Sequence, residues 1–308
     1  MKATVYKSTG SWYNVKTADG NSYQARIKGI FKIDDISSTN PVTVGDEVEI
    51  EIENDLENSV MITEIYERKN YIARSSPHGR GQHHIVASNL DLCLVFASLK
   101  DPKTSQGFID RLLVAAEAFH VKPAIVFNKA DLYRKKELEK FDELNSIYTK
   151  IGYKVFLVSV HDENGVDAVK DTLKTKTTLL CGHSGVGKST FINLIMPGFN
   201  IKTNEVSGWS GKGVHTTTFA EMFDLPFGGR IIDTPGVREF GVIDITKQEL
   251  SHYFPEMRIL INSCRFNNCH HINEPGCAVK DALIRGDVSA ERYQSYCNIL
   301  TSINNVNY

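Results

Sequence analysis

Residues 182–189 have the residue types and spacing that bind a chain of phosphates. Their sequence, Gly-His-Ser-Gly-Val-Gly-Lys-Ser, matches the P-loop pattern G-x-x-x-x-G-K-[ST] between an apolar segment and an expected helix. The glycines let the backbone turn tightly, so successive N–H groups can point at phosphate oxygens. We expect Lys188 to bind the β- and γ-phosphates and Ser189 to ligate Mg²⁺. The predicted phosphate-binding residues are Gly182, His183, Ser184, Gly185, Val186, Gly187, Lys188, Ser189 and Thr190.

The run Asn-Lys-Ala-Asp at residues 128–131 predicts which base is bound. The carboxylate of Asp131 can accept hydrogen bonds from N1–H and the 2-amino group of guanine. Adenine offers no such pair of donors, so this residue favours GTP over ATP, because mispairing a buried charge is costly. Ser159 and Val160 are placed to support the base edge through backbone contacts. The predicted guanine-binding residues are Asn128, Lys129, Asp131, Ser159 and Val160.

Two further segments are expected to face the γ-phosphate. The run Asp-Thr-Pro-Gly at residues 233–236 ends an apolar strand. There Asp233 can hold the Mg²⁺ shell, and the amide of Gly236 can sense the γ-phosphate. Residues 209–218 are the expected switch I, in which Thr217 is the favoured Mg²⁺ ligand.

The residue after the D-x-x-G glycine bears on catalysis. Ras-like enzymes place a water-orienting Gln there, whereas this chain has Val237, which cannot hydrogen-bond through its side chain. We therefore predict slow intrinsic hydrolysis that a partner accelerates. His215 is a candidate for positioning the water, and the alternative is an exposed loop histidine with no chemical role. The predicted catalytic residues are Lys188, Ser189, Thr217, Asp233 and His215.

The order of these motifs differs from that of Ras-like GTPases. The N-K-x-D run at 128–131 precedes the P-loop at 182–189, whereas Ras-like chains have the opposite order. A circular permutation preserves spatial neighbours when the new termini lie at exposed loops, so the nucleotide site can still form. In this order the segment after residue 236 runs directly into a cysteine-bearing tail.

Three of the six cysteines have the spacing of a metal site. Cys264, Cys269 and Cys277, with either His270 or His271, form the pattern C-x4-C-(x)-H-…-C. Three thiolates and one imidazole suit a closed, tetrahedral structural Zn²⁺ site, and the alternative is a set of unrelated thiols. The other three cysteines are expected to pack in the interior: Cys93 and Cys181 on apolar strands, and Cys297 on a helix.

The elements that must position these residues divide the chain into four parts. Residues 1–67 contain five short strand patterns and predict a small β-barrel, with an oligonucleotide-binding (OB) fold as first choice. Residues 68–90 hold no Asp or Glu and predict a basic linker. Residues 91–245 alternate strands and helices, which is typical of a doubly wound α/β domain. Residues 246–308 predict a helical domain around the cysteine-bearing insert.

Composition narrows the class of protein. The 35 basic and 37 acidic residues give a net charge of −2, which excludes a globally basic coat but not a local basic patch. No apolar run approaches the ~20 residues that span a bilayer, and the N-terminus lacks a signal-peptide core. We therefore expect a cytoplasmic protein in a reducing compartment, with no membrane partner.

The motif order, residues 213–218, residues 233–240 and the tail cysteines together resemble the RsgA (YjeQ) family of circularly permuted bacterial GTPases. The resemblance covers essentially the whole chain, although Val214 departs from the basic residue found there in many relatives. It implies a multidomain α/β chain with an N-terminal OB-fold β-barrel, a circularly permuted P-loop GTPase domain and a C-terminal helical zinc-binding domain. It also implies that His271 is the fourth ligand of one structural Zn²⁺.

The same resemblance implies a function. The chain would bind the small (30S) ribosomal subunit and its 16S rRNA, assist late-stage maturation, and hydrolyse GTP to GDP and phosphate with ribosome stimulation and release. We expect a monomer. Two alternatives remain open: an RNA-binding scaffold whose nucleotide site only holds structure, and an ATP-dependent P-loop kinase, against which Asp131 argues.

Overall fold

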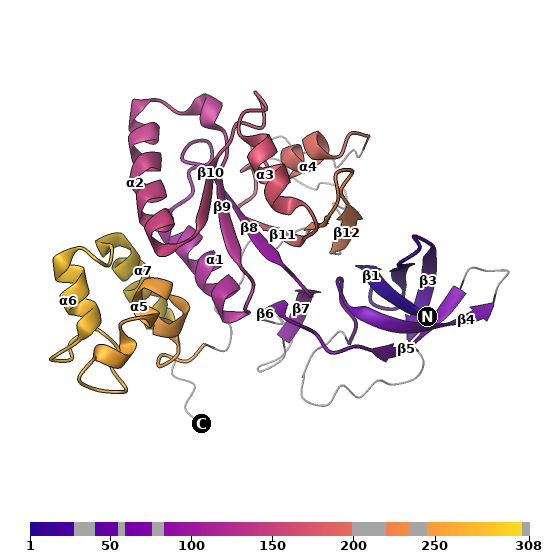
Figure 1. Cartoon of the computed structure of the whole chain (residues 1–308), viewed down its shortest axis with the longest axis horizontal. Coiled ribbons are helices and arrows are strands. Elements are labelled where there is room, and N and C mark those ends of the chain that lie inside the picture. The colour runs from indigo at the N-terminus through magenta and orange to yellow at the C-terminus, as the bar shows by residue number, and fades with distance from the viewer. Residues whose placement is uncertain (28–40, 55–58, 76–82, 199–219, 234–244, 304–308) are drawn as a thin grey trace, which may run out of the picture.

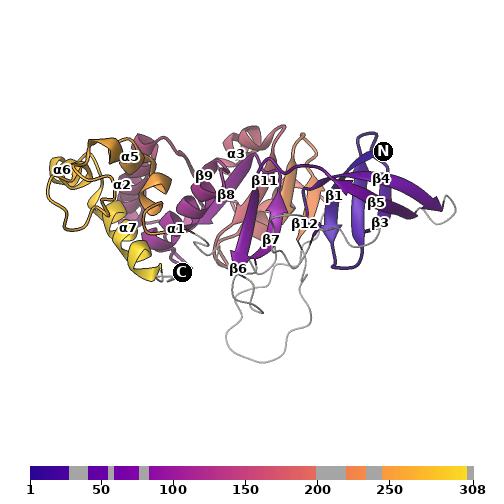
Figure 2. The same ribbon diagram turned by 90° about the horizontal axis from the view of Figure 1, so that it is seen from below.

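The computed structural model describes residues 1–27, 41–54, 59–75, 83–198, 220–233 and 245–303. A β-barrel, an α/β domain and a helical tail follow one another along the long axis, with the barrel and the tail on opposite sides of the α/β domain (Figures 1 and 2). This arrangement confirms the predicted fold class. None of the helices within these ranges is long and apolar enough to cross a membrane.

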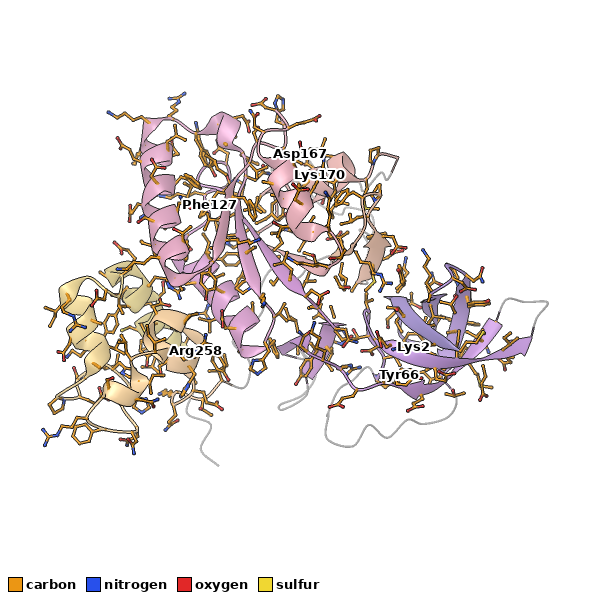
Figure 3. All side chains as sticks on the ribbon, viewed as in Figure 1. Lys2, Tyr66, Phe127, Asp167, Lys170 and Arg258 are labelled. Carbon is orange, nitrogen blue, oxygen red and sulfur yellow. The ribbon has the colours of Figure 1, made fainter. Side chains whose placement is uncertain are left out.

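The barrel is closed by pairing between its first and fourth strands. β1 pairs with both β2 and β4 in antiparallel fashion, and β3 pairs with β5 in parallel. Alternate side chains point inward, so Val5, Val15 and Ile62 are buried in its core. On the outside, the Lys2 ammonium lies 5.1 Å from the ring centroid of Tyr66 (Figure 3). The strands are β1 (Lys2–Ser8), β2 (Tyr13–Thr17), β3 (Ser22–Ile27), β4 (Glu47–Asn54) and β5 (Ser59–Ile65).

Part of the predicted linker forms two paired strands, with a register shift between Ile72 and Ala73. β6 (Tyr71–Ser75) and β7 (His83–Ser88) pair in antiparallel fashion, because Ile72 and Ala87 bury themselves in the same cluster as the α/β core. The absence of acidic residues in 68–90, on which the linker prediction rested, gave no indication of these two strands. Whether 68–90 is the boundary between two domains stays a prediction.

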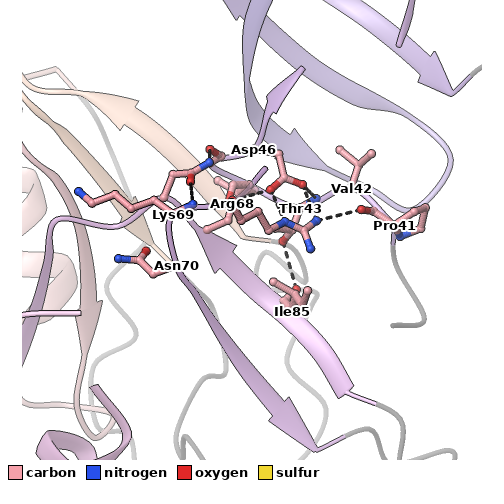
Figure 4. Close-up of polar contacts among 12 residues, drawn as sticks. Pro41, Val42, Thr43, Asp46, Arg68, Lys69, Asn70 and Ile85 are labelled. Atoms are coloured by element: carbon pink, nitrogen blue, oxygen red, sulfur yellow. Dashed lines mark hydrogen bonds and ion pairs between the residues drawn. The ribbon is translucent and has the colours of Figure 1, made fainter. Parts of the chain in front are cut away.

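The basic side chains at the start of this range are held in ion pairs. The guanidinium of Arg68 donates to both carboxylate oxygens of Asp46 at 2.7 Å and to the carbonyl of Pro41 at 2.9 Å (Figure 4). Lys69 pairs with Asp91 at 2.8 Å. The acidic partners of Arg68 and Lys69 therefore come from outside residues 68–90. Both cations are neutralised by these carboxylates.

The α/β domain places the nucleotide motifs directly after the carboxyl ends of its parallel strands. The strand order is β10-β9-β8-β11-β13-β12, parallel except for β12. Helices α1 and α2 pack on one face and α3 and α4 on the other, so β8 is buried throughout its length. The elements are β8 (Leu92–Ala97), α1 (Gln106–Ala118), β9 (Pro123–Phe127), the 3₁₀ turn η1 (Ala130–Leu132), α2 (Lys135–Ile151), β10 (Lys154–Leu157), α3 (Val166–Leu173), β11 (Thr177–Cys181), α4 (Lys188–Ile195), β12 (Glu221–Asp224) and β13 (Arg230–Asp233).

The barrel joins this sheet at its edge strand. Lys7 of β1 pairs with Glu221 of β12 through the backbone and through a 2.8 Å ion pair. Asp224 at the other end of β12 accepts hydrogen bonds from Tyr6 at 2.6 Å and from Lys16 at 2.5 Å. The described strands of the two domains therefore form one continuous sheet.

The tail has a small core of its own that includes a residue of α1. Val114 belongs to the same buried cluster as Phe254 and Tyr296 of the tail. The first described helical element of the predicted helical tail is a short 3₁₀ turn that begins at Leu250. The described tail elements are η2 (Leu250–Tyr253), α5 (Pro255–Arg258), η3 (Ile261–Ser263), α6 (Ala278–Arg285) and α7 (Ala290–Ser302).

Candidate functional site

The glycine-rich segment joins the end of β11 to the start of α4, as the sequence predicts. Gly182 has a φ of +137°, and a Cβ atom there would lie 2.2 Å from the carbonyl oxygen of Phe96. Gly187 has a φ of +99°, and its Cβ would lie 2.2 Å from the amide nitrogen of Asn128. Both positions require glycine, because the backbone conformation and the surrounding space exclude a side chain.

The ammonium group of Lys188 lies against the carbonyls of this loop. It donates hydrogen bonds to Gly182 at 2.6 Å and to His183 at 2.7 Å. Ser189 follows in the first turn of α4, and Asp233 ends β13, which pairs with β11. Lys188, Ser189 and Asp233, predicted to act on phosphates and Mg²⁺, thus lie at or after the carboxyl ends of the neighbouring strands β11 and β13. Ser184, Gly185, Val186 and Thr190 lie in the same loop and helical turn.

Asn128 connects three loops that are distant in sequence. Its side chain is buried, donates to the carbonyl of Val186 at 2.9 Å, and accepts from the N–H of Val160 at 3.1 Å. The amide therefore ties the predicted guanine-binding run to the phosphate-binding loop and to the second base loop. These contacts bring the three predicted nucleotide-binding segments together although their order along the chain is permuted.

Asp131 is oriented by a serine of the second base loop. The hydroxyl of Ser159 donates to Oδ1 of Asp131 at 2.7 Å. The sequence predicted only backbone contacts from Ser159, so the structure adds a role for its side chain. Lys129 has a left-handed backbone with φ of +66°, and its ammonium donates to the carbonyl of Asp101. All five predicted guanine-binding residues lie together.

Tyr133 is a residue of this site that the motifs missed. Its hydroxyl donates to the carbonyl of Asn128 at 2.7 Å and accepts from the N–H of Leu99 at 2.9 Å. The side chain is buried, and burial raises the pKa of its phenol. Its position five residues after Asn128 was the only sequence signal for this bracing contact. Residues 209–218, with His215 and Thr217, and residues 236 and 237 lie outside the described residues.

The tail brings four metal-ligand side chains together. Single ligand atoms of Cys264, Cys269, His271 and Cys277 all lie within 4.8 Å of one another. Nδ1 of His271 is the nitrogen that faces the thiols, 3.6 Å from Sγ of Cys264 and 3.4 Å from Sγ of Cys277. Burial lowers the pKa of His271, which favours the neutral imidazole that binds metals. Three thiols and one imidazole are compatible with a structural Zn²⁺ site.

The loop that carries His271 is fixed by α7 and by an internal carboxylate. Tyr293 and Tyr296 of α7 donate to the carbonyls of His271 at 2.6 Å and His270 at 2.8 Å. Glu274 accepts N–H groups of three loop residues, the nearest at 2.8 Å. His271 is therefore turned into the cluster, and the cluster among the described residues does not include the alternative ligand His270.

A buried arginine attaches this tail to the α/β domain. Arg292 of α7 is fully buried and donates to Asp110 of α1 at 2.8 Å and to Glu256 of α5 at 2.7 and 3.1 Å. Tyr148 of α2 also donates to Asp110, at 2.8 Å. Burial alone would lower the pKa of Arg292, but the two carboxylates more than offset it and raise that pKa.

Two protein-family models match this chain. A model described as the RsgA GTPase matches residues 65–243, and one described as the RsgA N-terminal domain matches residues 2–60. The first match includes the P-loop, the guanine-binding run and the D-x-x-G run in their permuted order.

Curated proteins and solved structures give the same similarity over nearly the full length. A protein of Bacteroides thetaiotaomicron named small ribosomal subunit biogenesis GTPase RsgA 2 is 50% identical over 300 residues, covering 97% of this chain and 96% of that protein. One of Cytophaga hutchinsonii named small ribosomal subunit biogenesis GTPase RsgA is 49% identical, covering 97% and 98%. The crystal structure of YjeQ from Thermotoga maritima aligns with a TM-score of 0.80 at 31% identity, covering 98% and 97%. That of YloQ, described as a circularly permuted GTPase, aligns at 0.76 and 29%, covering 100% and 96%.

Proposed function

This chain belongs to the RsgA GTPase family, and we propose on that premise that it acts in late maturation of the small (30S) ribosomal subunit. It would bind the subunit with GTP, hydrolyse GTP to GDP and phosphate under ribosome stimulation, and be released after hydrolysis. The observation that carries the nucleotide part is the Asn128 amide, which joins the guanine-binding loops to the P-loop in one site.

The residues of this site have separate tasks in the proposed reaction. Lys188 would neutralise charge on the β- and γ-phosphates, and Ser189 with Asp233 and Thr217 would hold Mg²⁺. Bound Mg²⁺ supplies charge neutralisation for the equatorial oxygens. Asp131, held by Ser159, would accept the two donors of guanine and so select GTP.

Slow turnover without a partner is part of the proposal. Val237 stands where Ras-like enzymes have the water-orienting Gln, and Gly236 would sense the γ-phosphate through its amide. His215 is the candidate that would position the attacking water once the ribosome orders the switch segments. Activation by the small subunit would then arise from orienting groups that the chain already contains.

The barrel presents a surface suited to RNA. The guanidinium of Arg26 lies 3.8 Å from the ring centroid of Trp12, a residue that is 38% exposed. An exposed aromatic ring beside a cation can stack on an unpaired base and attract phosphate. Lys7 and Lys16 on the same wall are engaged with Glu221 and Asp224. We propose that Trp12 and Arg26 contribute a contact to 16S rRNA.

The four-residue cluster of the tail would hold one structural Zn²⁺. Its ligands would be Cys264, Cys269, His271 and Cys277, and the metal would fix an irregular loop that has little core of its own. We further propose that the chain works as a monomer in the cytoplasm.

A GTPase assay with and without purified 30S subunits tests the function. We expect multiple-turnover phosphate release that rises at least tenfold with 30S subunits, and none with Lys188→Ala. An RNA-binding scaffold would bind the subunit without phosphate release. Equal affinity for ATP and GTP would instead support the kinase alternative and contradict the role of Asp131.

A further inference from the structure

Phe108, in the first turn of α1, lies against the phosphate-binding loop although no nucleotide motif includes it. Its ring stacks on the imidazole of His183, with ring centroids 3.5 Å apart and planes 18° apart. Both residues are half-buried. The carbonyl of His183 in turn accepts a hydrogen bond from the ammonium of Lys188 at 2.7 Å. Phe108 therefore contacts the residue whose backbone helps to place the lysine of the loop.

The helix that carries Phe108 is itself held in place. Ser105 caps its N-terminus, with its hydroxyl accepting from the N–H of Phe108 at 3.3 Å. Two residues further on, Asp110 is fully buried and bonded to Arg292 and Tyr148, at 2.8 Å each. The start of α1 thus holds the ring of Phe108 in place, and the stacking restricts the motion of the P-loop segment that carries His183.

We propose that Phe108 is a positioning residue for nucleotide binding, which rests on the proposed GTP site. By stacking on His183 it raises the population of the loop conformation that binds phosphates. The apparent dissociation constant equals the intrinsic one divided by the fraction of protein in the binding-competent conformation, so a smaller fraction means weaker binding. Aromatic pairs typically shift an equilibrium by about two- to tenfold. Because GTP and GDP both place a β-phosphate in this loop, the two nucleotides should be affected alike.

The test compares Phe108→Ala and Phe108→Tyr with Phe119→Ala. Phe119 is a matched control, since it directly follows α1 and packs its ring on Tyr71, 5.5 Å away, far from the P-loop. We measure the affinity for fluorescent methylanthraniloyl-GDP and for GTP by competition, and KM and kcat with 30S subunits. Phe108→Ala should weaken both nucleotides about two- to tenfold and raise KM with a smaller change in kcat. Phe108→Tyr and Phe119→Ala should stay within twofold.

A double-mutant cycle with His183→Ala separates the stack from general packing. If the ring acts through His183, Phe108→Ala should cost little more once His183 has been replaced. A loss below about twofold in Phe108→Ala, failure of Phe108→Tyr to restore binding, or full additivity in the cycle would each overturn the proposal. Phe108→Leu, which keeps most of the volume but no ring face, replaces Phe108→Ala if far-UV circular dichroism shows misfolding. Absence of nucleotide binding by the unmodified chain would refute the proposed function as well, whereas an unchanged Phe108→Ala refutes only this role.

Discussion

Replacement of Arg292 by alanine should open the junction between the tail and α1. Arg292 is the only cation that contacts both Asp110 and Glu256 among the described residues, and its side chain is 0% exposed. The substitution leaves Asp110, also 0% exposed, with the hydroxyl of Tyr148 but without a compensating charge. A buried carboxylate in that position must either be protonated or draw water into the junction, and both cost free energy.

The size of the effect follows from burial. Removing one partner of a buried ion pair costs about 3–5 kcal/mol, because an uncompensated charge stays in the interior. Arg258 is a matched control in the same tail. It also pairs with a carboxylate of α1, Glu117, but at 3.5 Å and with 52% of its side chain exposed. Exposed pairs contribute about 0–1 kcal/mol, so Arg258→Ala should change little.

Hydrogen exchange of the amides in α7 and α1 measures this difference. A decrease of ~3 kcal/mol in the free energy of local opening speeds amide exchange about a hundredfold, whereas a decrease of ~0.5 kcal/mol speeds it only about two- to threefold. Replacing Arg292 together with its more buried partner, as Asp110→Asn with Arg292→Met, should recover part of the protection, although Glu256 still loses its cation. Equal exchange in Arg292→Ala and Arg258→Ala would refute the idea that burial, rather than pairing as such, sets the strength of this junction.

Three further predictions concern the base, the metal and the barrel. Asp131→Asn should weaken GTP at least about tenfold and reduce its preference over xanthosine triphosphate, measured by competition. His271→Ala should lower the zinc content of the purified protein, while His270→Ala keeps one Zn²⁺ per chain, measured by elemental analysis. At Asp224, burial would raise the pKa, but hydrogen bonds from Lys16 and Tyr6 more than offset it and lower that pKa below 3.8. The stability lost in Asp224→Asn, about 1 kcal/mol or less, should therefore be present above pH 3.8 and fade below it in thermal melts.

The long, periodic elements were predictable from sequence, and the short or paired ones were not. The apolar segment before the P-loop and the helix expected after it agree with β11 and α4, because continuous apolar runs and helical spacing are local signals. β12 has only four residues, and Met222 is the one fully buried, so its pattern is too short to read. β6 and β7 were hidden by the basic character of their range.

Side-chain contacts within the site depended on the fold as a whole. The spacing of Asn128 and Asp131 predicted base recognition, but the bond from Asn128 to Val186 spans 58 positions and has no sequence signature. The same holds for Arg292, which reaches Asp110 across 182 positions and looks in the sequence like an ordinary helix residue. Local chemistry could be predicted, while the contacts that hold it in place required the tertiary structure.

The permuted strand order has a consequence for synthesis of the chain on the ribosome. β8 lies at the centre of the α/β sheet, buried along its whole length, between β9 and β11. β9 follows it closely, but β11 begins at Thr177, 80 positions after β8 ends at Ala97 (177 − 97). At about 5–20 residues per second, the central apolar strand waits roughly 4–16 s for its second neighbour. The nascent chain thus keeps an open hydrophobic edge in the half that holds the N-K-x-D run until the half with the P-loop emerges, and this interval is when chaperones would be most needed.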